Sequence, residues 1–157
     1  MPKSIYGETK AKSGNWASIL RLVDIQTLET LFAVPLTQND FAMSVEIVKF
    51  ASRSELHVLV GCAVDLHLNP RKLKGGAIYT FKLSAVQQDD KQVLQLSFVH
   101  RTEVEEAVGA IHSFGGRALV SVGRLARVYD IGHKKLLLKT ENRVISFKIW
   151  GNYWIHI

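Results

Sequence analysis

The side chains that could carry out catalysis or bind a metal are six histidines, one cysteine and fourteen acidic residues. The histidines include no close pair with metal-ligand spacing, and no cysteine or carboxylate cluster accompanies them. The sequence contains neither a Gly-x-Ser-x-Gly elbow nor a phosphate-binding loop. Glu103, Glu105 and Glu106 could resemble the paired acids of a hydrolase, but beside Arg101 they are better explained as a solvated edge. We therefore predict no catalytic residue, no metal site and no cofactor.

The single cysteine, Cys62, cannot form a disulfide within the chain. It lies in the apolar run 57–63, where a cysteine usually acts as a small buried hydrophobe rather than as a reactive thiol. We expect Cys62 to be buried and inert.

Basic residues cluster in two places. Residues 70–82 carry a charge of +4, and residues 124–143 carry six bases against two acids, again +4. Such clusters can bind phosphates, but they also keep the surface and edges of a β-rich protein soluble. The second explanation is favoured over direct RNA contact, because no array of aromatic residues interleaves these bases. The candidate phosphate or partner contacts are Arg71, Lys72, Lys74, Arg124, Lys134, Lys135 and Lys139.

The composition is that of one globular domain with a packed core. The chain has 157 residues, of which 47% are hydrophobic and 22% charged, and its formal net charge is +6. No apolar stretch approaches the roughly 18 residues of a membrane span, and residues 1–12 lack the apolar core of a secretory signal. These features predict a protein that is neither membrane-embedded nor secreted.

Apolar residues recur with a period of two or less almost everywhere, which predicts many short strands and no long helix. We expect tight hairpin turns at 115–116, 151–152 and 130–133, and surface loops at 64–75 and 85–92. The expected strands are 16–25, 28–36, 43–50, 56–63, 76–83, 93–99, 108–114, 118–123, 125–131 and 135–140, with two more between 144 and 157.

Two internal repeats predict a propeller. Residues 21–25 (RLVDI) recur as 127–131 (RVYDI), and the segment 79–83 (YTFKL), which lies between them, matches the same position of the repeat. Residues 114–120 (FGGRALV) recur as 150–156 (WGNYWIH). Four strands per repeat match a propeller blade. The expected fold is all-β: an incomplete β-propeller with a partial blade at 16–36, full blades at 43–99 and 108–140, and a partial blade at 144–157.

Alternation along 125–131 places Arg127 and Tyr129 on one face of a strand, and Ala126, Val128 and Asp130 on the other. One of these faces should pack between blades, and the sequence leaves open which.

Residues 122–142 resemble the triple-propeller family that includes the large damage-specific DNA-binding protein and the large subunit of the cleavage and polyadenylation specificity factor. The resemblance is to the spliceosomal branch of this family, and it covers about 14–142, whereas residues 1–13 match poorly. Members are several times longer, so the chain resembles a fragment or short form. Further segments agree in order: 16–18, 58–61, 68–71, 75–83 and 102–106.

The resemblance implies a non-catalytic scaffold in the nucleus that acts in pre-mRNA splicing at the branch site. The implied partners are the other subunits of the splicing factor 3b complex, including its helical-repeat subunit, and RNA is a further candidate. No membrane and no small-molecule substrate is implied. The alternative is a nucleic-acid-binding propeller of the same family, acting in mRNA 3'-end processing or DNA-damage recognition. A propeller enzyme is a third class, for which the sequence offers no convergent acids or metal ligands.

An incomplete propeller should also be marginally stable alone, because uncovered edges and apolar faces favour aggregation or partner binding.

Overall fold

The computed structural model describes residues 13–36, 39–88, 91–143, 147–150 and 153–156, and over these ranges the chain is built from strands and loops. None of the described residues forms a helix that is long and apolar enough to cross a membrane. The strands are β1 (Ile19–Val23), β2 (Thr30–Pro35), β3 (Asp40–Lys49), β4 (Leu56–Val64), β5 (His67–Leu68), β6 (Arg71–Lys72), β7 (Gly75–Gln88), β8 (Lys91–Val104), β9 (Val108–Phe114), β10 (Arg117–Val122), β11 (Leu125–Asp130), β12 (Leu137–Arg143), β13 (Phe147–Trp150) and β14 (Tyr153–His156).

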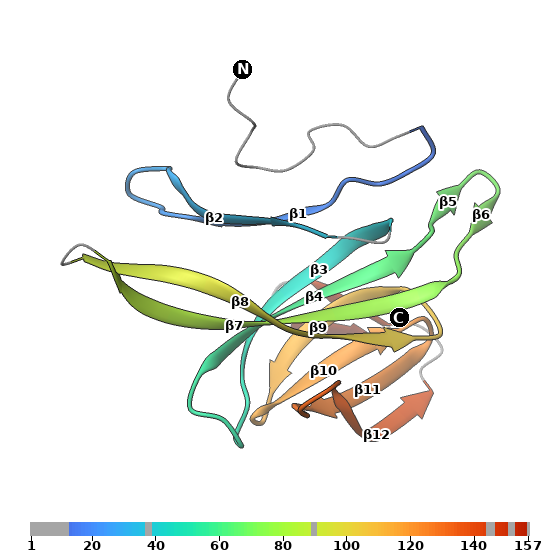
Figure 1. Cartoon of the computed structure of the whole chain (residues 1–157). Helices are drawn as coiled ribbons and strands as arrows, with labels where there is room; N and C mark the ends of the chain where they lie inside the picture. Colours follow the sequence, from blue (N-terminus) through green and yellow to red (C-terminus); the bar gives the residue numbers. More distant parts are fainter. Residues whose placement is uncertain (1–12, 37–38, 89–90, 144–146, 151–152, 157) are drawn as a thin grey trace.

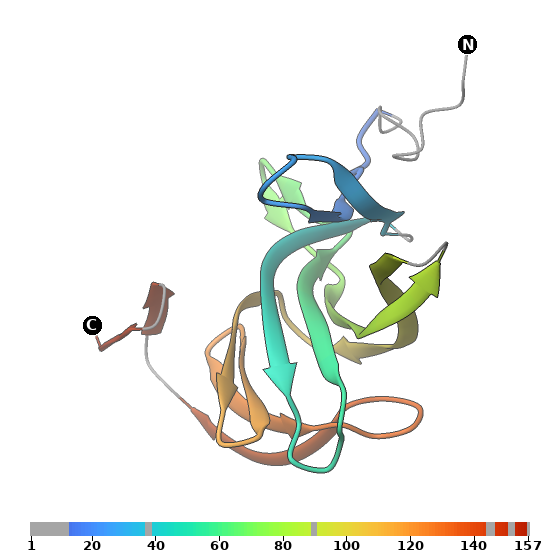
Figure 2. The ribbon, with the colours of Figure 1, turned by 90° about the vertical axis from the view of Figure 1, so that its left-hand side faces the viewer.

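Two four-stranded antiparallel sheets form the centre of the molecule. One has the order β3-β4-β7-β8, and we call it the central sheet; the other has the order β9-β10-β11-β12 and is called the second sheet. Figure 1 shows the β1–β2 hairpin and the second sheet on opposite sides of the central sheet. Figure 2 shows the same stacking from the side. The prediction of an all-β, incomplete propeller is confirmed.

Strand β4 of the central sheet is buried on both faces, which explains why its sequence is a nearly continuous apolar run. Leu59 faces the second sheet and packs in a cluster with Val108 and Val120. Val60 and its neighbours on the opposite face pack with Phe32 of the β1–β2 hairpin. Strict alternation of apolar and polar residues is absent because neither face of this strand meets water.

Close backbone approach joins the central sheet to the second sheet. A Cβ on Gly61 would lie 2.8 Å from the carbonyl oxygen of Val108. At the far end of the sheets, the Ala51 amide donates a 2.9 Å hydrogen bond to the carbonyl of Gly116. Gly116 has a φ of 73°, as the turn predicted at 115–116 requires.

Three turn or loop predictions differ from the structure. The segment 85–92 was expected to be a loop, but β7 and β8 continue pairing through Ala85↔Leu94 as far as Gln88↔Lys91. Strand β4 begins at Leu56, opposite Leu83, so beyond this point β7 and β8 form a two-stranded arm that no third strand requires to be apolar. Its polar residues were wrongly taken as a strand end. The loop at 64–75 contains the small hairpin β5–β6, and the connection between β11 and β12 spans 131–136 rather than a tight turn. The turn predicted at 151–152 lies outside the described residues.

Replacing Gly61 by Ala should destabilise the protein, because the new methyl group collides with Ser44 and Val108 across the sheet interface. The expected loss in free energy of unfolding is roughly 1–3 kcal/mol, measured by urea titration. Gly109→Ala is the matched control, since its Cβ would meet its nearest atom, Ser121 Oγ, at an ordinary 3.5 Å. Equal losses in both variants would contradict the proposed close packing at Gly61.

Two buried histidines should make stability depend on pH. His57 and His100 are 4% and 5% exposed, and burial lowers the pKa of each below its ordinary value of 6.5. The unfolded chain therefore binds more protons as the pH falls, so stability is fully present above pH 6.5 and decreases below it. The expected slope is at most about 1.4 kcal/mol per pH unit for each histidine.

Urea titrations between pH 7.5 and 5 test this dependence. The double variant His57→Gln with His100→Gln should flatten the curve, whereas His133→Gln, at an exposed loop position, should keep the wild-type slope. An unchanged slope in the double variant would assign the dependence to other groups.

Candidate functional site

A basic hollow forms where the central sheet meets the second sheet. Its volume is about 720 Å³. The β5–β6 hairpin contributes Arg71 and Lys72, and the turn between β10 and β11 contributes Arg124. The connector between β8 and β9 adds Glu105 and Glu106. Three of the predicted contact residues, distant in sequence, therefore line one concave surface.

The charge balance of the hollow favours an anionic partner. The Arg127 guanidinium holds Glu105 through N–H groups 2.7 and 3.3 Å from its two carboxylate oxygens. These hydrogen bonds lower the Glu105 pKa, and Arg127, which also pairs with Glu141, offsets part of the Glu105 charge. Arg71, Lys72 and Arg124 outnumber the two carboxylates of the lining, Glu105 and Glu106. Such a surface can accept phosphates or an acidic peptide segment.

The other four predicted contact residues lie elsewhere. Lys74 pairs with Asp65, with 2.7 Å between Nζ and Oδ2, and this contact raises the Lys74 pKa. Lys134 and Lys135 lie in the connection that follows β11, whereas Arg124 directly precedes that strand, so they lie at opposite ends of it. Lys139 is exposed on β12. The seven residues do not form one continuous surface.

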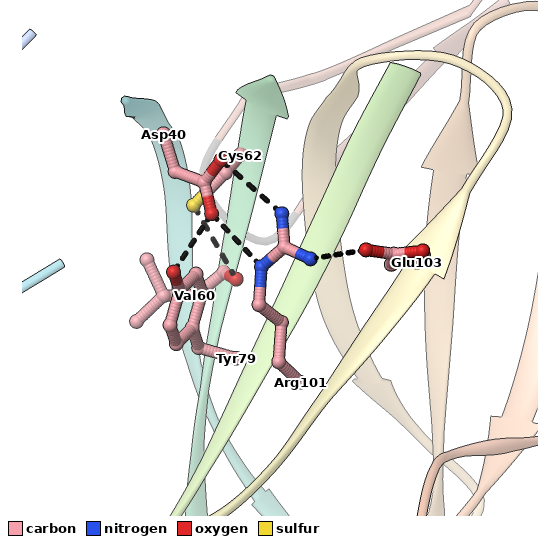
Figure 3. A network of polar contacts seen from close by, with 6 residues as sticks. All are labelled: Asp40, Val60, Cys62, Tyr79, Arg101 and Glu103. Atoms are coloured by element: carbon pink, nitrogen blue, oxygen red, sulfur yellow. Dashed lines mark hydrogen bonds and ion pairs between the residues drawn. The ribbon is translucent and has the colours of Figure 1, made fainter. Parts of the chain in front are cut away.

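A buried ion pair, which sequence reasoning missed, joins the first and last strands of the central sheet (Figure 3). The Asp40 carboxylate on β3 accepts hydrogen bonds from Nε and NH2 of Arg101 on β8, at 2.9 and 3.2 Å. It also accepts one from the Tyr79 hydroxyl at 2.7 Å. Burial alone would lower the Arg101 pKa. The hydrogen bonds to Asp40 and its negative charge have a larger effect in the opposite direction, so the Arg101 pKa is raised. The sequence did offer one signal of a buried charge, because Asp40 is an acidic residue at the start of a strand with apolar residues. It could not identify Arg101 as the partner, which lies 61 residues further along the chain.

A second buried arginine fixes the second sheet. In addition to its contact with Glu105, Arg127 donates a hydrogen bond from Nε to Glu141 at 3.0 Å, and its NH1 lies 3.4 Å from the Tyr129 hydroxyl. Tyr129 packs in the apolar cluster between the two sheets, and its burial raises its pKa. The face of 125–131 that carries Arg127 and Tyr129 is therefore the one that packs between blades, a question that the sequence left open.

Both arginine networks position strands and offer no reactive group. The expectation for Cys62 is confirmed: it is fully buried, and burial raises the pKa of its thiol to about 12. Within the described residues, no three His, Cys, Asp or Glu side chains gather closely enough to hold a metal ion.

Comparison with known proteins identifies relatives across the chain. The family profile described as CPSF A subunit region matches residues 17–155. Splicing factor 3B subunit 3 of Danio rerio is 45% identical over 99% of this chain, and that of Drosophila melanogaster is 41% identical over 95%. Pre-mRNA-splicing factor RSE1 of Mycosarcoma maydis is 39% identical over 88%. The chain spans only 12%, 12% and 11% of the length of these three relatives.

Replacing Asp40 by Asn should destabilise the fold, because the largely buried charge of Arg101 would lose its buried carboxylate partner and keep the exposed Glu103. The expected loss is about 3 kcal/mol in the free energy of unfolding, measured by chemical denaturation. Asp65→Asn removes the carboxylate that pairs with the exposed Lys74, and it should cost far less. A D40N variant as stable as D65N would show that the buried pair contributes no net stability.

Proposed function

The chain belongs to the CPSF A subunit region family, and from this premise we propose that it is a non-catalytic scaffold acting in pre-mRNA splicing at the branch site. The observation that carries the proposal is the identity of 45% and 41% to proteins named splicing factor 3B subunit 3, over nearly the whole chain. A scaffold works by burying a preformed surface against its partners, without any bond chemistry.

The proposed partners are the other subunits of the splicing factor 3b complex, including its helical-repeat subunit, and the proposed compartment is the nucleus. The basic hollow supports docking, because it is preformed by two adjacent sheets and its lining carries three cations against two carboxylates. An acidic segment of a partner subunit would complement Arg71, Lys72 and Arg124.

The β7–β8 arm offers a second docking surface of different character. Beyond Leu83 its two strands pair only with each other, so the arm projects past the central sheet. Leu94 on it is 42% exposed, and Phe98, on the same face nearer the sheet, is 59% exposed. Apolar side chains on a regular, hydrogen-bonded arm can be buried by a partner at small cost in conformational entropy.

The alternative is a nucleic-acid-binding function, as in mRNA 3'-end processing or DNA-damage recognition. The observation that favours it is the same hollow, because three cations facing one cavity can also hold a phosphate backbone. The two functions differ in their dependence on nucleic acid and on salt. Binding through phosphates weakens steeply as the salt concentration rises, whereas a partly apolar protein interface is less sensitive.

A pull-down of the tagged chain from nuclear extract, with and without nuclease, tests the proposal. The scaffold function predicts that splicing factor 3b subunits remain bound after nuclease treatment. A triple variant, Arg71→Gln with Lys72→Gln and Arg124→Gln, should reduce their recovery severalfold, because it removes the three cations of the hollow.

The matched control removes the same number of charges elsewhere, with Lys134→Gln, Lys135→Gln and Lys139→Gln, and should leave recovery unchanged. Capture that disappears with nuclease would favour the nucleic-acid alternative. Recovery of chaperones alone would contradict both functions.

A further inference from the structure

The outer strand of the central sheet, β8, has a long edge beside which no further strand lies. In the part of the chain that the structure describes, β8 pairs with β7 on one side and with no strand on the other. Figure 1 shows the β7–β8 arm extending past the rest of the central sheet. The backbone N–H and C=O groups along such an edge can pair with an additional strand.

The segment 92–99 of this edge carries no charged residue and no proline. Most of its side chains are exposed: Gln92, Leu94, Gln95, Ser97, Phe98 and Val99. Proteins commonly protect an edge strand from unwanted pairing with charged residues or proline. The outer strand of the second sheet, β12, follows this rule, because it carries Lys139, Glu141 and Arg143. Strand β8 has the same outer position in its own sheet and lacks this protection over 92–99.

The two faces of this segment differ in polarity. Leu94, Leu96 and Phe98 alternate along β8 and therefore share one face. This face is the one toward the β1–β2 hairpin, since Leu96 belongs to the apolar cluster that the hairpin covers. Gln95 and Ser97 lie on the opposite face, and both are exposed. An additional strand would therefore have apolar neighbours on one face and uncharged polar neighbours on the other.

The apolar side chains of this edge are already held in place. The Phe98 ring lies against Phe81 of β7, with 5.8 Å between the ring centroids, while 59% of Phe98 remains exposed. Leu94 is opposite Ala85 in the paired arm and is 42% exposed. Because the arm is already ordered by strand pairing, these side chains can be buried at small cost in conformational entropy.

A single extended segment fits this edge better than a second copy of the chain does. Strand β2 of the hairpin lies against β8, so the hairpin takes up space above the apolar face. A second copy that paired through its own β8 would bring another hairpin to the same face. The two hairpins would then compete for the space above neighbouring strands, which are only about 4.8 Å apart. A charged segment is also disfavoured, because 92–99 offers no opposite charge.

We propose that an uncharged, extended segment of a protein partner pairs with residues 92–98 of β8 as an additional strand. Alternate residues of this segment are apolar, on the face of Leu94 and Phe98, and the residues between them are polar, on the face of Gln95 and Ser97. Backbone hydrogen bonds supply the affinity of such a contact, and the alternate side chains supply its specificity. The inference deepens the docking proposed for the arm, and it rests on the proposed function only for the identity of the partner.

Amide hydrogen exchange with a peptide probe tests the strand pairing. The probe is a synthetic peptide with blocked ends and the sequence QVLQLSF, copied from 92–98, because this sequence has the required alternation and no charge. Its binding should slow the exchange of alternate amides in 92–98 by at least about tenfold, since every second N–H of an edge strand points toward a new neighbour. A peptide of the same composition with its apolar residues grouped, FLLVQQS, is the matched control and should give no such protection.

Two double variants locate the contact. Leu94→Thr with Phe98→Thr should weaken binding of the alternating peptide by roughly tenfold, because it removes the exposed apolar side chains and keeps residues that favour strands. Leu137→Thr with Leu138→Thr changes side chains of similar exposure on β12 and should leave binding unchanged. In the pull-down from nuclear extract, the first double variant should also reduce the recovery of splicing factor 3b subunits severalfold.

Three results would overturn the proposal. The first is an alternating peptide that does not bind at about 1 mM, and the second is one that binds without slowing the amides of 92–98. The third is a free chain that light scattering shows to be a dimer with these amides already protected, because a second copy would then occupy the edge. Wild-type protein that recovers no splicing factor 3b subunit, yet pairs with the peptide, would contradict the proposed function and leave the strand pairing supported.

Discussion

The structure depends on one constraint, which is that the central sheet has to be covered on both faces. Its strand β4 carries apolar residues at successive positions, so covering one face alone would leave half of them in water. The second sheet covers one face and the β1–β2 hairpin covers part of the other. The incomplete covering by the hairpin explains both an apolar groove of about 300 Å³ between β1 and β3 and the exposure of Val45 and Ile47.

The charged residues inside the fold follow from the same layered arrangement. Asp40 and Arg101 join the first and last strands of the central sheet, and Arg127 joins the second sheet to the connector residue Glu105. Each arginine is largely removed from water, and each meets carboxylates in well-formed hydrogen bonds, which is the condition under which a buried charge is tolerated. These groups therefore specify how strands are placed, which accords with the proposal of a scaffold.

The candidate docking site is itself a product of blade stacking. The hollow is lined both by the β5–β6 hairpin, which connects β4 to β7, and by the turn between β10 and β11 of the second sheet. Neither sheet alone would bring Arg71 and Arg124 to one surface. A site shared by adjacent blades is present only when both are folded and packed, so the stability of the sheet interface at Gly61 and the docking proposed for the hollow are linked.

The sequence alone determined the strand-rich fold, the repeating unit of four strands, the turn at 115–116 and the burial of Cys62. These features depend on local chemistry: the period of apolar residues, the backbone freedom of glycine and the composition of a short run. Tertiary structure alone decided that the β7–β8 arm continues through polar residues, that Asp40 meets Arg101, and which face of β11 packs inward. It also divided the predicted basic residues between the hollow and other surfaces. The physical reason is that pairing and packing join residues far apart in the chain, and no local pattern records which distant strand will cover a given face.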